Sequence, residues 1–218
     1  MKLVVFDLDT ALCQTSGMDG FAMASAIKDV AKCRIKPETV RELHDLSAIW
    51  YRATRRFPSA LDLAGLQKRF SFHLRRQFLI RPSVIPANYG LIEQINLLQH
   101  KKDTIVGLVS ATSATVMQLR ANAIGLVCAT LPHATGDDAD SLPGILLSLQ
   151  TRVRRSFGFY FDSFDLIAGL AWQTAATAAH MNHYLPADYL KSGSVQIRDQ
   201  IRDSQLTRSS KLFSFADC

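Results

Sequence analysis

The first apolar run of the chain ends in two aspartates, because residues 3–9 read Leu-Val-Val-Phe-Asp-Leu-Asp. Four consecutive apolar residues are typical of a parallel strand that is buried on both faces. Residues i and i+2 of a strand point to the same side, so we expect Asp7 and Asp9 to face one point where this strand ends. Two carboxylates at close range need either a shared proton or a shared cation. The pattern therefore predicts a chemically active site at the end of a buried strand.

The rest of the chain divides into a helical part and an alternating part. Helical apolar spacing predicts helices at about 17–33, 37–56 and 59–79, followed by a linker at 81–86. Beyond the linker we expect helices at 88–100, 113–124, 142–152 and 163–178, alternating with strands at 104–109, 126–130, 157–161 and 181–185. Strands that alternate with helices favour an α/β fold with a doubly wound parallel sheet, covered by helices on both faces.

The expected elements imply two domains. Residues 1–14 and 87–218 would form the α/β core, and residues 15–86 would form an inserted all-helical cap domain. Near the end of the core we expect an amphipathic helix at 195–206 and a loosely ordered segment at 207–218.

The composition indicates a globular protein. In 218 residues, an apolar content of 48% and a charged content of 20% provide for a sizeable core. No apolar run approaches the roughly 18 to 20 residues that cross a membrane, and no signal-peptide pattern opens the sequence, so we expect a cytoplasmic protein without membrane contact. The cysteines show no CxxC pair and no metal-ligand spacing, which favours reduced thiols at Cys13, Cys33, Cys128 and Cys218.

Positive charge is concentrated between residues 50 and 81. The formal net charge of the chain is +6, and this segment has eight basic residues against the single acid Asp62: Arg52, Arg55, Arg56, Lys68, Arg69, Arg75, Arg76 and Arg81. Such a basic field favours an anionic partner, either a phosphorylated small molecule or a nucleic acid, although each arginine is also compatible with a solvated helix face. Helical spacing explains most of the interleaved aromatic residues as core, which makes a nucleic acid the less favoured partner.

Polar residues follow three of the expected strands. Asp7 and Asp9 follow the first strand, the segment 110–112 (Ser-Ala-Thr) follows the second, and Asp162 with Asp165 follows the strand expected at 157–161. In open parallel sheets, ligands bind beyond the carboxyl ends of the strands, near the point where the strand order reverses. We therefore expect these three groups to contribute to one site.

The order of these features resembles the haloacid-dehalogenase superfamily. The resemblance rests on the segment 6–12 (Phe-Asp-Leu-Asp-Thr-Ala-Leu), the helical insertion, the segment 108–110 (Leu-Val-Ser) and an acidic turn before a helix. Within the superfamily, the pattern is similar to phosphatases of the phosphoglycolate phosphatase type, whose helical cap is inserted just after the first strand. The resemblance covers about residues 1–185 and implies a Rossmann-like core and a Mg²⁺-dependent phosphomonoester hydrolase.

The resemblance also implies a role for each candidate residue. Asp7 would be the nucleophile that becomes an aspartyl phosphate, and Asp9 would protonate the leaving alcohol and then activate water. Ser110 and Ala111 would bind the phosphoryl oxygens of a small phosphorylated substrate. Oxygen ligands suit Mg²⁺, and the family pattern implies a site formed by Asp7, Asp9, Asp162 and Asp165.

The sequence departs from the family pattern at three places. The segment 141–144 (Ser-Leu-Pro-Gly) has no lysine where family members have one, and Ala11 stands where a threonine is usual, with Thr10 just before it. In the acidic turn, Phe161 replaces a glycine and Asp165 follows Asp162 by three residues instead of four.

These departures leave two alternatives open. In one, His133 or an arginine of the helical insertion replaces the missing lysine and the enzyme is active. In the other, the chain is a catalytically impaired protein that binds a ligand or a protein partner. The sequence carries no signal for an oligomeric state.

Overall fold

The computed structural model describes residues 1–41, 46–80, 85–158 and 160–191. The amphipathic helix expected at 195–206, the segment 207–218, most of the linker expected at 81–86, Arg81 and Cys218 lie outside the described residues. The cysteines inside them, Cys13, Cys33 and Cys128, are free thiols, as expected.

A five-stranded parallel sheet organises the chain, with the strand order β3-β2-β1-β4-β5. The strands are β1 (Lys2–Asp7), β2 (Thr104–Val109), β3 (His133–Ala134), β4 (Ser163–Ile167) and β5 (Asn182–Tyr184). The order reverses beside β1, which pairs with β2 on one side and β4 on the other. This confirms the expected doubly wound α/β fold and makes the carboxyl end of β1 the switch point, where such sheets bind ligands.

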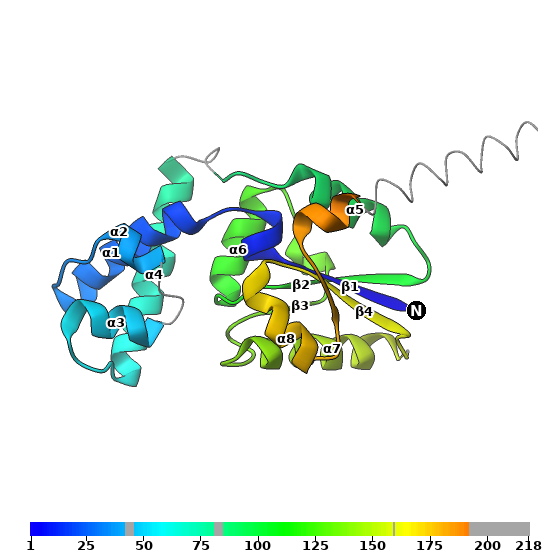
Figure 1. Cartoon of the computed structure of the whole chain (residues 1–218). Helices are drawn as coiled ribbons and strands as arrows, with labels where there is room; N and C mark the ends of the chain where they lie inside the picture. The colour runs from blue at the N-terminus through cyan, green and yellow to red at the C-terminus, as the bar shows by residue number, and fades with distance from the viewer. Residues whose placement is uncertain (42–45, 81–84, 159, 192–218) are drawn as a thin grey trace, which may run out of the picture.

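Alternate side chains of β1 enter two separate apolar cores, one on each face of the sheet. Val4 and Phe6 pack with helices α5 (Tyr89–Gln99) and α6 (Ala114–Ala123), whereas Leu3 and Val5 pack with α7 (Leu142–Phe157) and α8 (Gln173–Ala178). Figure 1 shows α5 and α6 on one side of the sheet and α7 and α8 on the other. The continuous apolar run of β1 is explained by this burial on both faces.

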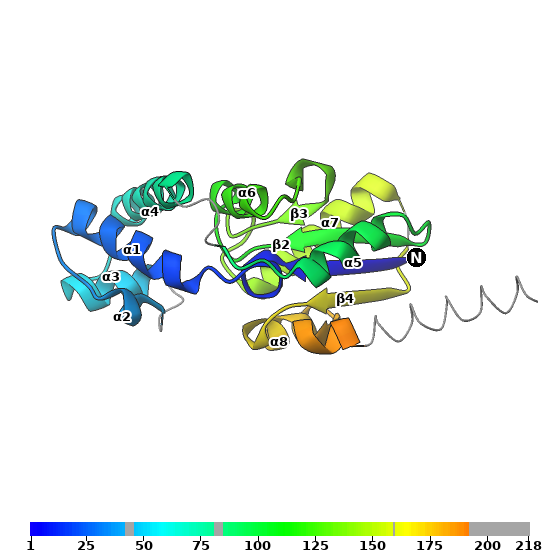
Figure 2. The same cartoon turned by 90° about the horizontal axis from the view of Figure 1, so that it is seen from above.

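Between β1 and α5, the described residues form four α-helices, α1 (Ser16–Ala31), α2 (Pro37–Arg41), α3 (Leu46–Thr54) and α4 (Ala60–Ile80). They gather beyond the carboxyl ends of the strands, with α1 alongside α4 (Figures 1 and 2). Leu66, Phe70, Leu74 and Phe78 recur at helical spacing on the buried side of α4. The helical character expected for this segment is therefore confirmed, whereas the domain boundaries stay a prediction.

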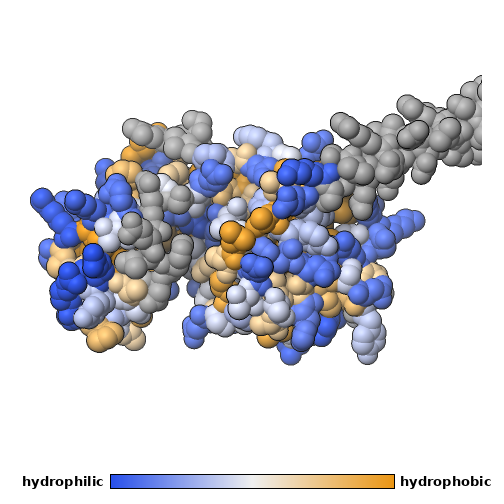
Figure 3. Space-filling model, viewed as in Figure 1, coloured by the Kyte–Doolittle hydropathy of each residue, from blue (hydrophilic) through white to orange (hydrophobic). Residues whose placement is uncertain are grey.

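The face seen in Figure 3 is mostly hydrophilic, with scattered apolar residues. Within the described residues, no helix is both long and apolar enough to cross a membrane.

Two of the expected strands are wrong. The segment expected as a strand at 126–130 contains a 3₁₀ turn (Cys128–Thr130), and β3 forms later, at His133–Ala134, beside the end of β2. The described residues of 157–161 also form no strand: helix α7 continues through Phe157 and ends at Gly158, whose φ of 65° is the left-handed conformation that terminates helices. The true strand, β4, occupies the start of the helix expected at 163–178.

Candidate active site

Asp7 is the last residue of β1 and is entirely buried. It caps a five-residue π-helical turn, η1 (Leu8–Leu12), by accepting hydrogen bonds from the residues that follow it. Asp7 Oδ2 accepts from the backbone N–H of Thr10 at 2.8 Å and from the Thr10 hydroxyl. Asp7 Oδ1 has only a long contact, 3.4 Å, with the backbone N–H of Asp9. One carboxylate oxygen is thus fixed by the turn, and the other is weakly engaged.

Burial and, after it, the nearby charge of Asp9 raise the pKa of Asp7 to about 7, against the opposing hydrogen bonds from Thr10 and the Asp9 backbone. Asp7 has no ion pair among the described residues. Near neutral pH, Asp7 is therefore close to the midpoint between its neutral and charged forms.

Asp9 lies on the turn and not on the strand, so strand alternation does not explain its position. Its side chain lies against the loop that follows β2, where Asp9 Oδ2 accepts hydrogen bonds from Ser110 Oγ at 2.7 Å and from the backbone N–H of Ala111 at 3.1 Å. Its other oxygen, Oδ1, pairs with the guanidinium of Arg120. All the residues expected at the ends of the first two strands are therefore brought together.

The loop after β2 is held in place by its own hydrogen bonds. The buried Ser110 follows β2 directly, and its backbone N–H donates to the Ala134 carbonyl at 3.1 Å. Its hydroxyl also lies 2.7 Å from the Thr112 hydroxyl. Gly136 donates to the Thr112 carbonyl at 2.8 Å, and a Cβ there would come within 2.7 Å of the Ala111 carbonyl oxygen. The close approach of Gly136 thus fixes the loop that carries Ser110 and Ala111.

Arg120 is the functional candidate that sequence reasoning missed. It lies on α6 with only 1% of its surface exposed, and its guanidinium pairs with Asp9 on one side and with Asp19 Oδ1 of α1, at 2.8 Å, on the other. Burial lowers the pKa of Arg120, but the two carboxylates outweigh burial, so the pKa is raised overall. A sequence signal did exist: Arg120 falls at helical spacing from Val116 and Met117, on the buried side of α6.

Asp19 anchors this arginine from the helical insertion. Asp19 Oδ2 accepts a hydrogen bond from the Thr15 hydroxyl at 2.6 Å. Burial raises the pKa of Asp19, while Arg120 and Thr15 oppose the rise. The chain of contacts Asp9–Arg120–Asp19 therefore joins η1, α6 and α1 through one buried cation.

Asp162 and Asp165 do not lie at the expected end of the sheet, because β4 begins only at Ser163. Asp162 precedes β4 at its amino end, is exposed, and pairs with the Met1 amino group at 2.5 Å. Asp165 lies within β4, opposite Val4 of β1, three residues short of Asp7 in register. Three residues of a strand span about 10 Å. The expectation that both acids follow the strand and join Asp7 is therefore wrong.

Asp165 has a structural explanation for its burial. Lys2 Nζ lies 2.5 Å from its carboxylate, and the side-chain amide of Asn182 on β5 donates to it at 3.0 Å. A buried carboxylate with a cation and a hydrogen-bond donor is a stable arrangement that joins three neighbouring strands.

The carboxyl end of β4 carries Ala168 and Gly169 instead of acids. The backbone N–H of Gly169 donates to the Thr10 hydroxyl at 2.7 Å, and Thr10 in turn donates to Asp7. A Cβ at Gly169 would lie 2.9 Å from Thr10 Oγ1. This strand end therefore positions the turn that holds Asp7.

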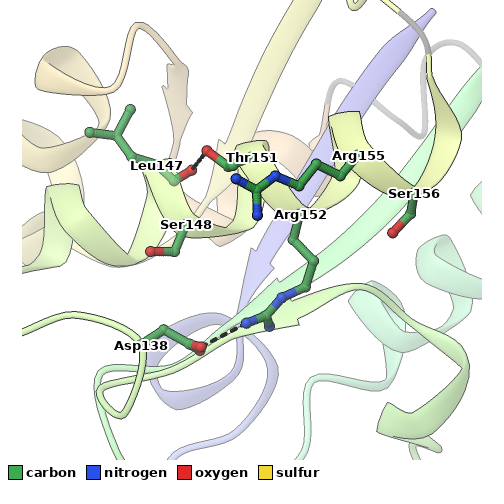
Figure 4. Close-up of a pocket in the computed structure, with 7 residues that line it drawn as sticks. All are labelled: Asp138, Leu147, Ser148, Thr151, Arg152, Arg155 and Ser156. Atoms are coloured by element: carbon green, nitrogen blue, oxygen red, sulfur yellow. Dashed lines mark hydrogen bonds and ion pairs between the residues drawn. The ribbon is translucent and has the colours of Figure 1, made fainter.

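His133 and Arg152 of α7 are engaged outside the site. The His133 ring bonds to the Leu131 carbonyl at 3.0 Å. Arg152 pairs with Asp138 at 2.7 Å and contacts the His133 carbonyl, beside a surface depression along α7 that shares no lining residue with the site (Figure 4). Among the described residues, the cation in contact with Asp9 is Arg120.

We predict that Asp7→Asn stabilises the protein in a pH-dependent manner. Because the folded-state pKa of Asp7 is raised from 3.8 to about 7, the folded state binds more protons between these values and wild-type stability falls as pH rises. The variant lacks this loss, so it should exceed wild type by about 2–4 kcal/mol at pH 8 and match it near pH 4. Urea unfolding at both pH values measures this, and an equal difference at both would contradict the assignment.

We predict that Gly169→Ala destabilises the site. The added methyl meets Thr10 Oγ1 at 2.9 Å and Thr10 Cβ at 3.0 Å, and Thr10 cannot move without losing its bond to Asp7. We expect a cost of about 1–3 kcal/mol in thermal or urea unfolding. The control is Gly65→Ala on α4, whose methyl would make an ordinary 3.6 Å contact with Val30. Equal stability of the two variants would show that the close approach at Gly169 is unimportant.

Comparison with known proteins finds similar folds among solved structures. No protein-family model and no curated protein matches the chain. CbbY from Rhodobacter sphaeroides, in complex with phosphate, aligns with a TM-score of 0.65 at 16% identity, covering 83% of this chain and 84% of that chain. A HAD hydrolase (family IA, variant 3) from Entamoeba histolytica aligns with a TM-score of 0.63 at 12% identity, covering 82% and 81%.

A third structure, a predicted phosphoglycolate phosphatase from Haemophilus somnus, aligns with a TM-score of 0.58 at 15% identity and covers 88% of this chain and 98% of that chain. At these identities the likeness shows the fold. The five-stranded parallel sheet and the helices between β1 and β2 agree with it. The chain therefore has the fold of the haloacid-dehalogenase hydrolases.

Proposed function

We propose that the chain is a phosphomonoester hydrolase that acts on a small phosphorylated molecule, with Asp7 as its nucleophile. One observation carries the proposal. At the switch point of a haloacid-dehalogenase fold, a buried carboxylate lies beside an Asp9 that is held by two donors suited to a phosphoryl group, the Ser110 hydroxyl and the Ala111 N–H.

The geometry of Asp7 suits attack by one particular oxygen. Oδ2 accepts two hydrogen bonds from Thr10, which fixes the orientation of the carboxylate. Oδ1 is the freer oxygen and is the atom that would form the bond to phosphorus. With a pKa of about 7, a substantial fraction of Asp7 is ionised near neutral pH.

A bound phosphoryl group would need the donors that now hold Asp9. Ser110 Oγ and the Ala111 N–H both donate to Asp9 Oδ2. Substrate binding therefore requires Asp9 to give up these two bonds, which moves its carboxylate within reach of the leaving group or of water. From there Asp9 would protonate the leaving alcohol and then activate water, the two tasks expected of it.

The charge of the chain and the ligands of its structural neighbours support the proposed substrate class. CbbY from Rhodobacter sphaeroides has been solved with phosphate and, as a variant, with xylulose-(1,5)bisphosphate. In this chain the helical insertion presents an exposed basic set consisting of Arg52, Arg55, Lys68, Arg69, Arg75 and Arg76. A basic surface beyond the carboxyl ends of the strands favours the approach of a small anionic substrate.

The residues present do not fit the Mg²⁺ ion that the fold family implies. Within the described ranges, no group of three or more His, Cys, Asp or Glu side chains is arranged to hold a metal. Asp162 and Asp165 lie elsewhere in the sheet, and the end of β4 provides Ala168 and Gly169 in place of acids. We therefore assign no step of the reaction to a metal.

We predict that the protein hydrolyses at least one member of a panel of small phosphomonoesters and that Asp7→Asn abolishes this activity. Loss of the nucleophile should lower the rate by about 10³-fold or more. Phosphate release measured with and without Mg²⁺ gives the readout, and circular dichroism verifies that the variant is folded.

Asp162→Asn is the matched control, since it removes a carboxylate from the opposite end of the sheet. We expect this variant to retain wild-type activity. If wild type and Asp7→Asn are equally inert on every ester, the chain is not a phosphatase and the proposal fails.

A further inference from the structure

The charge of Arg120 is buried, which is energetically unfavourable, and the proposed reaction gives this residue no role. Its side chain is almost fully inaccessible, and moving a guanidinium out of water costs several kcal/mol before its partners compensate. Asp9 and Asp19 provide that compensation from two different segments of the chain. This arrangement places a permanent positive charge against Asp9, whose other oxygen is held by Ser110 and Ala111, the residues expected to bind a phosphoryl group.

The donors around the Asp9 carboxylate indicate that this part of the molecule suits an anion. Three donors from two segments converge on it: the Ser110 hydroxyl at 2.7 Å, the Ala111 N–H at 3.1 Å and the Arg120 guanidinium. A carboxylate and a phosphoryl group offer the same kind of charged oxygen acceptor. Asp9 thus occupies, as an internal anion, a set of donors that would equally hold an external one.

The Arg120 guanidinium is held in place, and one of its N–H donors is without a partner among the described residues. Asp19 holds the far side of the guanidinium, and the Thr15 hydroxyl holds Asp19 in turn. Arg120 Nε is buried without a hydrogen-bond partner among the described residues. An arginine stays charged at all physiological pH values, so the charge needs no ion from solution.

We propose that Arg120 is the resident cation of the phosphoryl site, so that this chain binds a phosphoryl group without a divalent metal. The inference rests on the proposed function, because it takes the Ser110 and Ala111 donors as the place of the phosphoryl group. On binding, a phosphoryl oxygen replaces the Asp9 carboxylate as the acceptor for the Ser110 and Ala111 donors. The Arg120 guanidinium then pairs with the phosphoryl group in place of Asp9. Arg120 thereby supplies the positive charge that a metal ion and a lysine supply in the family pattern.

The first test uses the wild-type protein and orthophosphate. Isothermal titration calorimetry in EDTA and in Mg²⁺ should give dissociation constants that agree within about twofold. Binding that appears only with Mg²⁺ overturns the role of Arg120 while leaving the phosphatase proposal intact. No binding in either condition, together with no hydrolysis, contradicts the proposed function and with it this inference. The outcomes of the two proposals are therefore distinguishable.

The second test changes the cation. Arg120→Met should weaken orthophosphate binding at least tenfold in EDTA, and Arg120→Lys should bind more tightly than Arg120→Met because it keeps the charge. Arg152→Met is the matched control, since it removes an arginine–carboxylate pair on α7, outside the site (Figure 4). Wild-type affinity in a folded Arg120→Met variant overturns the inference. If that variant does not fold, the EDTA titration of wild type decides alone.

Discussion

The buried ion pair between Arg120 and Asp9 is the interaction on which the arrangement of the site depends. It joins the turn after β1 to α6, and the second pair, with Asp19, extends the connection to the first helix of the insertion. Neither carboxylate nor guanidinium is stable at this depth alone, because an unpaired buried charge is strongly destabilising. The three groups therefore hold η1, α6 and α1 in one arrangement.

Asp7 is held by a different kind of constraint. Its environment is short of positive charge, and its orientation comes from hydrogen bonds with Thr10, which Gly169 fixes from the end of β4. The two carboxylates of the site therefore have different partners: Asp9 pairs with a cation, whereas Asp7 accepts hydrogen bonds from neutral donors. This separation explains why burial raises the pKa of Asp7 to about 7 and gives the two groups different chemical tasks.

The fold and half of the site were predictable from the sequence. The apolar run before Asp7 and the alternation of elements after residue 88 are local signals that tertiary contacts did not override. Asp7, Ser110 and Ala111 were found because they directly follow strands whose apolar pattern is clear.

Strand β4 was misplaced because the aromatic segment 157–161 resembles a strand, while the true strand contains the polar pair Ser163 and Asp165. Only the three-dimensional contacts with Lys2 and Asn182 make a buried Asp165 acceptable. Arg120 was missed because it belongs to no motif, and its partners lie far away in the sequence, Asp9 at 111 residues and Asp19 at 101 (120 − 19).

A crystal structure of the protein with tungstate, a phosphate mimic, in the presence of EDTA would test the central claim most directly. We expect tungstate oxygens on Ser110 Oγ, the Ala111 N–H and the Arg120 guanidinium, with the Asp9 carboxylate moved off these donors and Asp7 Oδ1 facing the tungsten atom. Tungstate bound elsewhere, with Asp9 still on Ser110 and Ala111, would contradict the account. Tungstate that binds this site only when Mg²⁺ lies beside Asp7 would contradict the role given to Arg120.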